Sequence, residues 1–110
     1  MSPQTPVSSA RDEVRPVVPH LIDLTEKVLF GDVWERPGLS KRDRSLITVA
    51  TLVATYRPEQ LKGHTERALA NGVTKEEISE LITHLAFYAG WPAAMSAAKV
   101  VKQVFEEKKP

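Results

Sequence analysis

The sequence predicts an all-α protein of five helices joined by short loops. Apolar residues recur at three- and four-residue spacing, and glycine, proline and capping residues separate these stretches. No segment alternates apolar and polar residues in the way of a half-buried strand. The chain has 110 residues, 42% of them hydrophobic, which is enough for one domain with one core.

The charge balance and the lack of cysteine exclude several classes of protein. Fifteen Lys and Arg stand against fourteen Asp and Glu, so the net charge does not steer the protein strongly toward nucleic acid or an acidic membrane. Without cysteine there are no disulfides, thiolate metal ligands or thiol catalysis, which fits a reducing cytoplasm. The first ten residues do not resemble a signal peptide, and the longest apolar run, 46–54, is too short to span a bilayer. We therefore expect a soluble, cytoplasmic protein.

The N-terminal part differs in composition from the rest of the chain. Residues 1–18 contain several prolines and serines, and we predict a tail or packing arm there. The helical domain is predicted to span residues 19–110. From Pro19, leucine and valine recur at helical spacing, which predicts a first helix that ends at Gly31.

The second predicted helix, residues 41–55, follows a connector and is preceded by Ser40 as the N-cap, with Asp43 in the capping-box position. After its first turn the helix is nearly all apolar, and a helix that is apolar on all sides is expected to be buried on all sides. We therefore expect it to be the central helix. A monomer of this size can hardly surround such a helix, so we also expect subunit association.

The third predicted helix carries a histidine. Pro58 suits its first turn, and Asn71-Gly72 supplies the cap after residue 70. His64 lies in the middle of this helix. It is either an ordinary, partly exposed helical histidine or a functional one, and the sequence leaves both interpretations open.

Two further helices complete the predicted fold. Thr74 and Glu77 form a capping box that opens the fourth helix, and Gly90 ends it. Pro92 marks the start of the fifth helix, whose alanines permit close helix–helix approach.

Other side chains are candidates for function or for structural contacts. His84 and Tyr88 are four residues apart and share a helix face, which also suits a hydrogen-bonded pair in the core or at a subunit interface. Arg44 directly precedes the apolar block, at a place where its guanidinium can pair with a carboxylate of a substrate or of the protein. His20, near the start of the first helix, is a weaker candidate. Arg42 is expected to be solvated.

No metal or cofactor site is predicted. The histidines never form an H-x-x-x-H pair, and no nearby carboxylates complete a ligand set. The chain also has no G-x-S-x-G, P-loop or G-x-G-x-x-G motif.

Three stretches of the chain resemble the carboxymuconolactone decarboxylase family. They are GDVWERPGLSKRDRSLITVATL at 31–52, LKGHTERALANGVTKEEISELITH at 61–84 and YAGWPAA at 88–94. The similarity covers roughly residues 30–105. It implies an orthogonal bundle of five to six helices of the alkyl hydroperoxidase D-like type. It also implies a homo-oligomer, with a hexamer favoured and a trimer as the alternative.

A sister branch of this family is excluded as a guide to activity. The alkyl hydroperoxidase D-like proteins use a glutamate, a C-x-x-C pair and a histidine, and the resemblance places their histidine on His64. Their glutamate falls on Ser45, and their cysteines fall on Arg57 and Gln60. Thiol peroxidase chemistry is therefore excluded, because no thiolate is present.

The reaction that the resemblance implies is cofactor-free decarboxylation of a carboxylated lactone in aromatic compound catabolism. Such a reaction needs a positive charge where negative charge develops and an acid that protonates carbon. We expect His64 and Arg44 to be catalytic, with Arg44 holding an anionic group of the substrate and His64 donating the proton. The residues expected to bind the substrate or line its pocket are Ser45, Gln60, Trp34, His84 and Tyr88.

Two alternatives to a lyase remain open at this point. One is a non-catalytic oligomeric protein of the same fold that binds a small molecule. The other is a redox role that uses the thiols of a partner protein. An enzyme is expected to place His64 in a closed apolar pocket beside Arg44.

Overall fold

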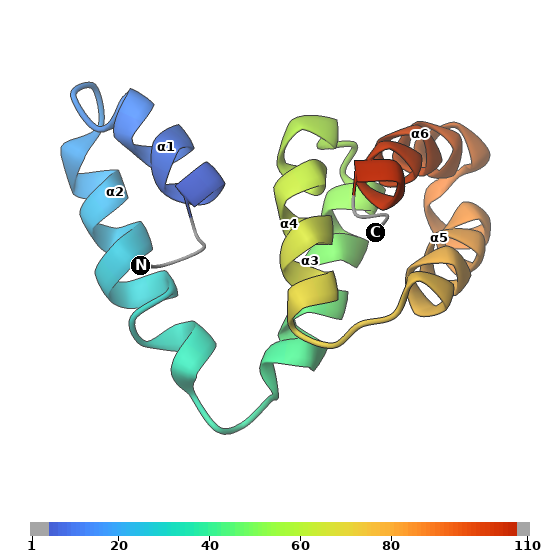
Figure 1. Ribbon diagram of the computed structural model, residues 1–110, viewed down its shortest axis with the longest axis horizontal. Helices are drawn as coiled ribbons and strands as arrows, with labels where there is room; N and C mark the ends of the chain where they lie inside the picture. Colours follow the sequence, from blue (N-terminus) through green and yellow to red (C-terminus); the bar gives the residue numbers. More distant parts are fainter. Residues whose placement is uncertain (1–4, 108–110) are drawn as a thin grey trace. The chain divides into compact units, whose positions relative to one another are not determined.

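The computed structural model describes residues 5–107, and this part of the chain is helical apart from short connections (Figure 1). The all-α prediction is confirmed. The chain divides into two compact units, which within the described part are residues 5–39 and 40–107. The α-helices are α1 (Thr5–Val14), α2 (Pro19–Leu24), α3 (Lys41–Ala54), α4 (Pro58–Ala70), α5 (Lys75–Ala89) and α6 (Trp91–Glu107). A π-helical turn, Thr25–Leu29, continues α2, and a 3₁₀ turn covers Val33–Glu35.

The first unit contains a helix that the sequence analysis did not predict. Helix α1 lies within the stretch predicted as a tail or packing arm, whose residues 1–4 lie outside the described part. Val7, Ala10 and Val14 stand at helical spacing along it, but the prolines and serines around them favour the prediction of a tail.

Directly after α1, Arg15 donates to Asp12 at 3.0 Å and to Glu26 of the π-helical turn at 2.6 Å. Residues 19–39 belong to the same compact unit as α1. The predicted helical domain of residues 19–110 stays a prediction.

A small apolar centre holds the first unit together. Ile22 and Trp34 are buried, and the Trp34 ring stacks on Phe30 at a centroid distance of 5.8 Å. Gly31 follows the turn as predicted, and a Cβ there would lie 2.6 Å from the carbonyl oxygen of Lys27. The helix therefore ends where only glycine fits.

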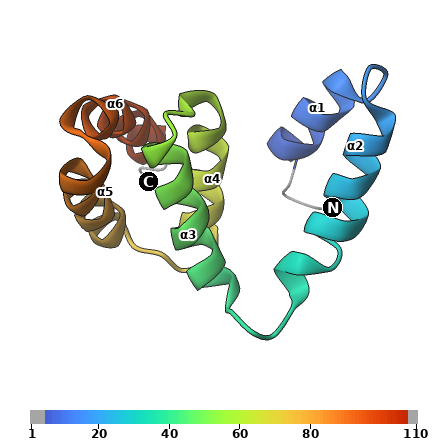
Figure 2. The same cartoon turned by 180° about the vertical axis from the view of Figure 1, so that it is seen from behind.

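The second unit is a four-helix arrangement around one hydrophobic core (Figures 1 and 2). Helix α3 packs against α4, α5 and α6, and α6 likewise packs against the other three helices, so the predicted central position of α3 is shared with α6. All four helices contribute apolar side chains to the core. Its buried residues are Val49, Val53, Leu61, Ala68, Val73, Ile78, Ile82, Ala86, Ala94, Ala97 and Val101.

The prediction that α3 is buried on all sides is wrong for the single chain. Its fully buried residues, Ser45, Val49 and Val53, follow one another at four-residue spacing and form one face. On another face Ile47 is 54% exposed. The hydroxyl of Thr51 donates a hydrogen bond to the backbone carbonyl of Ile47, so it finds its partner within the same helix.

The predicted helix ends are confirmed. The Ser40 hydroxyl accepts from the Asp43 backbone N–H at 3.0 Å, and Thr74 and Glu77 form a reciprocal capping box. Gly90 has a φ of +107°, which allows α6 to start immediately after α5. Arg42 stays partly exposed, and it forms a surface ion pair with Glu77 that links the starts of α3 and α5.

Candidate functional site

The packed helices α3 and α4 carry the main catalytic and polar candidates. Ser45, in the first turns of α3, is 1% exposed, and its hydroxyl accepts a hydrogen bond from the side-chain amide of Asn71 at 2.9 Å. Asn71 is the C-cap of α4. The bond therefore fixes the end of α4 against the start of α3 and orients the serine hydroxyl.

Arg44 lies next to Ser45 in the first turns of α3. Its side chain is half-buried, at the edge of the core as the sequence predicts. Its backbone carbonyl accepts from the hydroxyl of Thr48 at 2.8 Å, one turn further along α3. A guanidinium at such an edge keeps its charge and presents planar donors that suit a carboxylate.

His64 lies in the middle of α4 and is half-buried. Burial of the imidazole is the main cause that lowers its pKa below the ordinary 6.5, and the positive charge of Arg67, one turn on, lowers the pKa further. The neutral imidazole is therefore the predominant form at neutral pH. Gln60, one turn before His64 and exposed, shares its helix face.

The contact between Ser45 and Asn71 sets how far the two catalytic candidates lie from each other. His64 precedes Asn71 by seven residues, which is about 10 Å along the axis of α4. Arg44 neighbours Ser45, so its backbone lies near the Asn71 end of α4. The two candidates thus lie on packed helices but in different turns.

The structure places His84 and Tyr88 on the surface of the chain. Their rings stack with centroids 4.8 Å apart and an angle of 27°, and Tyr88 is 78% exposed. The interpretation of this pair as part of the core is therefore wrong, and the subunit-interface interpretation stays a prediction. Phe87 and Trp91 lie beside them, with their rings in an edge-to-face contact at 5.1 Å.

These exposed aromatic residues form what we call the aromatic patch: His84, Phe87, Tyr88 and Trp91. Phe87 is 74% and Trp91 55% exposed. The sequence analysis did not single out Phe87 or Trp91. The signal was present, because α5 has apolar residues on more than the one face that a single-chain core requires.

Trp34 belongs to the first unit. It is 7% exposed and packs against Phe30, so its indole forms part of the apolar centre of that unit. This contact gives Trp34 a structural role there. Its predicted place in the lining of a substrate pocket stays a prediction.

Two pockets lie between α5 and α6, and none of the seven predicted site residues lines either of them. Among residues 5–107, no three His, Asp or Glu side chains form a group that could hold a metal ion. No helix in the same part of the chain has the length and apolar character needed to cross a membrane.

Two residues near the candidates carry signals that the sequence analysis missed. Arg67 follows His64 at helical spacing, which could have pointed to its effect on the imidazole. Thr65 is 0% exposed, and its hydroxyl has no hydrogen-bond partner within the described part of the chain. A buried hydroxyl without a hydrogen-bond partner destabilises the folded chain. Thr65 directly follows His64 in α4.

Comparison with known proteins identifies relatives over most of this chain. Residues 19–103 match the sequence pattern of the carboxymuconolactone decarboxylase family. The chain is 45% identical over 78 residues to 4-carboxymuconolactone decarboxylase of Acinetobacter baylyi, a match that covers 71% of this chain and 58% of that protein. It is 35% identical over 85 residues to nitrosuccinic acid decarboxylase of Metarhizium robertsii, covering 77% of this chain and 59% of the relative.

A third relative is an uncharacterized 15.0 kDa protein of Paracoccus denitrificans. The chain is 32% identical to it over 100 residues, covering 89% of this chain and 72% of the relative. The chain therefore spans a larger part of this protein than of the two decarboxylases, of which it spans less than two thirds.

Proposed function

The chain belongs to the carboxymuconolactone decarboxylase family, and we propose on this premise that it is a carboxy-lyase. The proposed substrate is a small carboxylated lactone or a related acid, and the proposed chemistry is cofactor-free general acid–base catalysis. One observation carries the proposal. Half-buried Arg44 and His64 lie on packed helices in a chain whose named relatives are decarboxylases.

In the proposed reaction the bond between the substrate carbon and its carboxylate breaks, and carbon dioxide leaves without the bonding electrons. These electrons delocalise into the conjugated carbonyl group as an enolate. The guanidinium of Arg44 holds an anionic group of the substrate, and Ser45 and Gln60 offer hydrogen bonds. The His64 imidazolium then protonates carbon, and water restores the proton to the ring.

The proposed reaction requires His64 to carry a proton although its environment disfavours the charged form. Burial and the charge of Arg67 lower the pKa of His64, which makes its imidazolium a stronger acid than an exposed one. An anionic substrate beside the ring raises the pKa again, because an opposite charge favours the protonated form. Substrate binding and proton uptake are thus coupled in this proposal.

The test measures carbon dioxide release from 4-carboxymuconolactone and from nitrosuccinic acid, the compounds in the names of the two decarboxylases. His64→Gln is expected to lower kcat by about 10²-fold or more, since general acid catalysis contributes on that scale. Arg44→Met is expected to lower kcat/KM by about 10-fold or more, because it removes a charge-assisted contact to the substrate.

The matched control is His20→Gln, which changes an exposed histidine of the first unit. Turnover by this variant should equal that of the unchanged protein. If both site variants keep full turnover of a substrate that the protein decarboxylates, the residue assignment is wrong. If neither compound releases carbon dioxide, these two substrates are wrong and the lyase proposal loses its support.

Self-association is a second part of the proposal. A homohexamer is favoured over a trimer by the family resemblance, and the exposed aromatic patch together with Ile47 offers apolar surface for such contacts. Light scattering should give a mass well above the 12.2 kDa of one chain. A mass of one chain would contradict the proposal. The cytoplasmic location stays a prediction.

A non-catalytic small-molecule-binding protein of the same fold is the alternative function. The observation that favours it is the absence of the seven candidate residues from the lining of the two pockets between α5 and α6. Under this alternative, ligands bind without releasing carbon dioxide, and His64→Gln leaves their affinity unchanged.

A further inference from the structure

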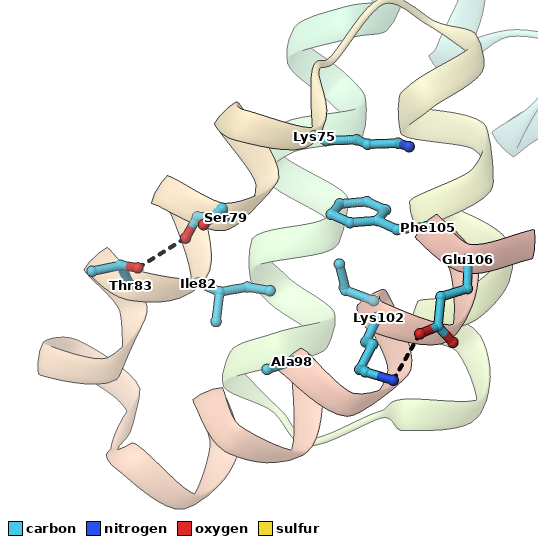
Figure 3. Close-up of a pocket in the computed structure, with 9 residues that line it drawn as sticks. Lys75, Ser79, Ile82, Thr83, Ala98, Lys102, Phe105 and Glu106 are labelled. Carbon is cyan, nitrogen blue, oxygen red and sulfur yellow. Dashed lines mark hydrogen bonds and ion pairs between the residues drawn. The ribbon is translucent and has the colours of Figure 1, made fainter. Parts of the chain in front are cut away.

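The larger pocket is a groove between α5 and α6 with a volume of about 490 Å³. This volume lies within the range of small-molecule sites in proteins. Figure 3 shows Ile82 pointing into the space between the two helices. Most of the exposed lining of the groove is apolar, and charged and hydroxyl groups make up the rest. The lining residues are Lys75, Ser79, Ile82, Thr83, Ala98, Val101, Lys102, Phe105 and Glu106.

The two ends of the groove differ in chemistry. At one end stand the charged residues Lys75, Lys102 and Glu106. At the other end the groove continues into a smaller hollow of about 170 Å³, which shares Ile82, Thr83 and Ala98 with it. Beyond these shared residues the hollow is lined by apolar side chains alone: Ala86, Trp91, Ala94 and Met95.

The charged end carries one net positive charge. Lys102 and Glu106 form an ion pair at 2.8 Å and neutralise each other. The Lys75 ammonium lies over the ring of Phe105, 5.4 Å from its centroid, and no carboxylate among residues 5–107 pairs with it (Figure 3). Lys75 is also the first residue of α5, where the helix dipole favours an anion.

We propose that this groove binds an unbranched alkyl carboxylate, with the carboxylate at Lys75 and the alkyl chain along Ile82 toward Ala94. The charge at one end matches the head group, and the apolar lining and hollow match the chain. Lys75 and Ala86 are eleven residues apart on α5, which gives the groove a length of about 16 Å. A medium-chain fatty acid fits this length better than a compact ring acid does.

The experiment titrates the native protein with decanoate below its critical micelle concentration and with decanol below its solubility limit, and follows backbone amide shifts by NMR. Decanoate is expected to shift amides along the facing sides of α5 and α6 and to bind more tightly than decanol. Lys75→Met is expected to weaken decanoate binding about fivefold, as for an exposed charge pair, and to leave decanol binding unchanged.

Two further variants complete the experiment. Ala98→Trp fills the place where the groove and the hollow meet, so it is expected to abolish binding of both ligands. Ala98 is exposed, and circular dichroism checks that the helices of this variant are intact. Lys99→Gln removes a neighbouring exposed lysine that does not line the groove, and it should leave both affinities unchanged.

Several results would overturn the proposal. Equal affinity for decanoate and decanol, or an unchanged decanoate affinity in Lys75→Met, would show that the charged end does not bind the carboxylate. Shifts confined to other helices would place the ligand elsewhere. Absence of binding, combined with a lower molecular mass of Ala98→Trp, would mean that a second copy of the chain occupies the groove.

Discussion

The α3–α4 and α5–α6 helix pairs are similar in length and contribute to the same core, yet they differ in what they bury and expose. Helices α3 and α4 bury Ser45 and Thr65 and half-bury Arg44 and His64. Every buried residue of α5 and α6 is apolar. These two helices instead carry the open groove and the aromatic patch.

Buried polar side chains and an open pocket both help to locate a functional site, and in this unit they lie on different helix pairs. The pair with the catalytic candidates is tied by a serine–asparagine hydrogen bond, whereas none of the candidates lines the open volume between α5 and α6. The described pockets and the predicted catalytic residues thus lie on different helix pairs. The predictions below address what each pair contributes.

The largest effect is expected at the aromatic patch. Phe87 is 74% exposed in the single chain, so Phe87→Glu should leave the fold of one chain intact. If the patch mediates self-association, burying a charge there should weaken it by about 30-fold, or about 2 kcal/mol, as at an interface hot spot. Sedimentation velocity across a dilution series measures this. Glu80→Gln, an exposed change on the same helix, is the control, and an equal effect of both variants would refute the role of the patch.

On α4, Thr65→Val is expected to stabilise the protein by about 1 kcal/mol, because it replaces a buried, unsatisfied hydroxyl with a methyl group of similar volume. Urea unfolding gives the free energy. Thr65→Ser keeps the hydroxyl, loses a buried methyl and should destabilise. Destabilisation by valine would mean that the hydroxyl forms a bond in the folded protein.

The starts of α5 and α3 provide a finer comparison. Thr74→Ala removes half of a reciprocal capping box and is expected to cost about 1 kcal/mol. Ser40→Ala removes one bond to the Asp43 backbone N–H and is expected to cost about 0.5 kcal/mol. Thermal unfolding of both variants ranks them. The reverse order would show that α3 depends more on its cap than α5 does.

The smallest effect concerns pH. Because burial and Arg67 lower the pKa of His64, the unfolded chain takes up a proton near pH 6.5 and the folded chain only at lower pH. The free energy of unfolding should therefore decrease as the pH falls from about 6.5 to the folded pKa, and His64 adds no pH dependence above that window. His64→Gln should remove this part of the slope in urea titrations. Arg67→Gln removes a positive charge that lowers the pKa of His64, so it should narrow this pH window. Arg67→Lys keeps the charge and should preserve the window.

Much of the fold was predictable because its signals are local. Ser40, Pro58, Thr74 and Gly90 each act on backbone groups within a few residues, and the structure uses all four at helix ends as predicted. Helix α1 was not predictable in this way. Its apolar residues stand among prolines and serines, and contacts such as that between Arg15 and Glu26, eleven residues apart, accompany it.

The candidate site was predictable by residue type and less so by arrangement. The sequence indicated half-buried Arg44 at the core edge, and the structure places it there. The hydrogen bond from Asn71 to Ser45 joins residues 26 apart, and no local pattern indicates it. The exposed state of His84 and Tyr88 was equally hidden, because shared spacing on a helix fixes a common face but not what covers that face.

The amino-acid sequence alone determined the helices of the second unit, their caps and the absence of thiol chemistry, since each depends on residue types and short-range spacing. Only the tertiary structure decided which face of α3 is buried, how Ser45 meets Asn71, and where the groove between α5 and α6 opens. The physical reason is that burial and packing depend on which distant segments come together, and helical periodicity specifies a face without specifying its neighbour.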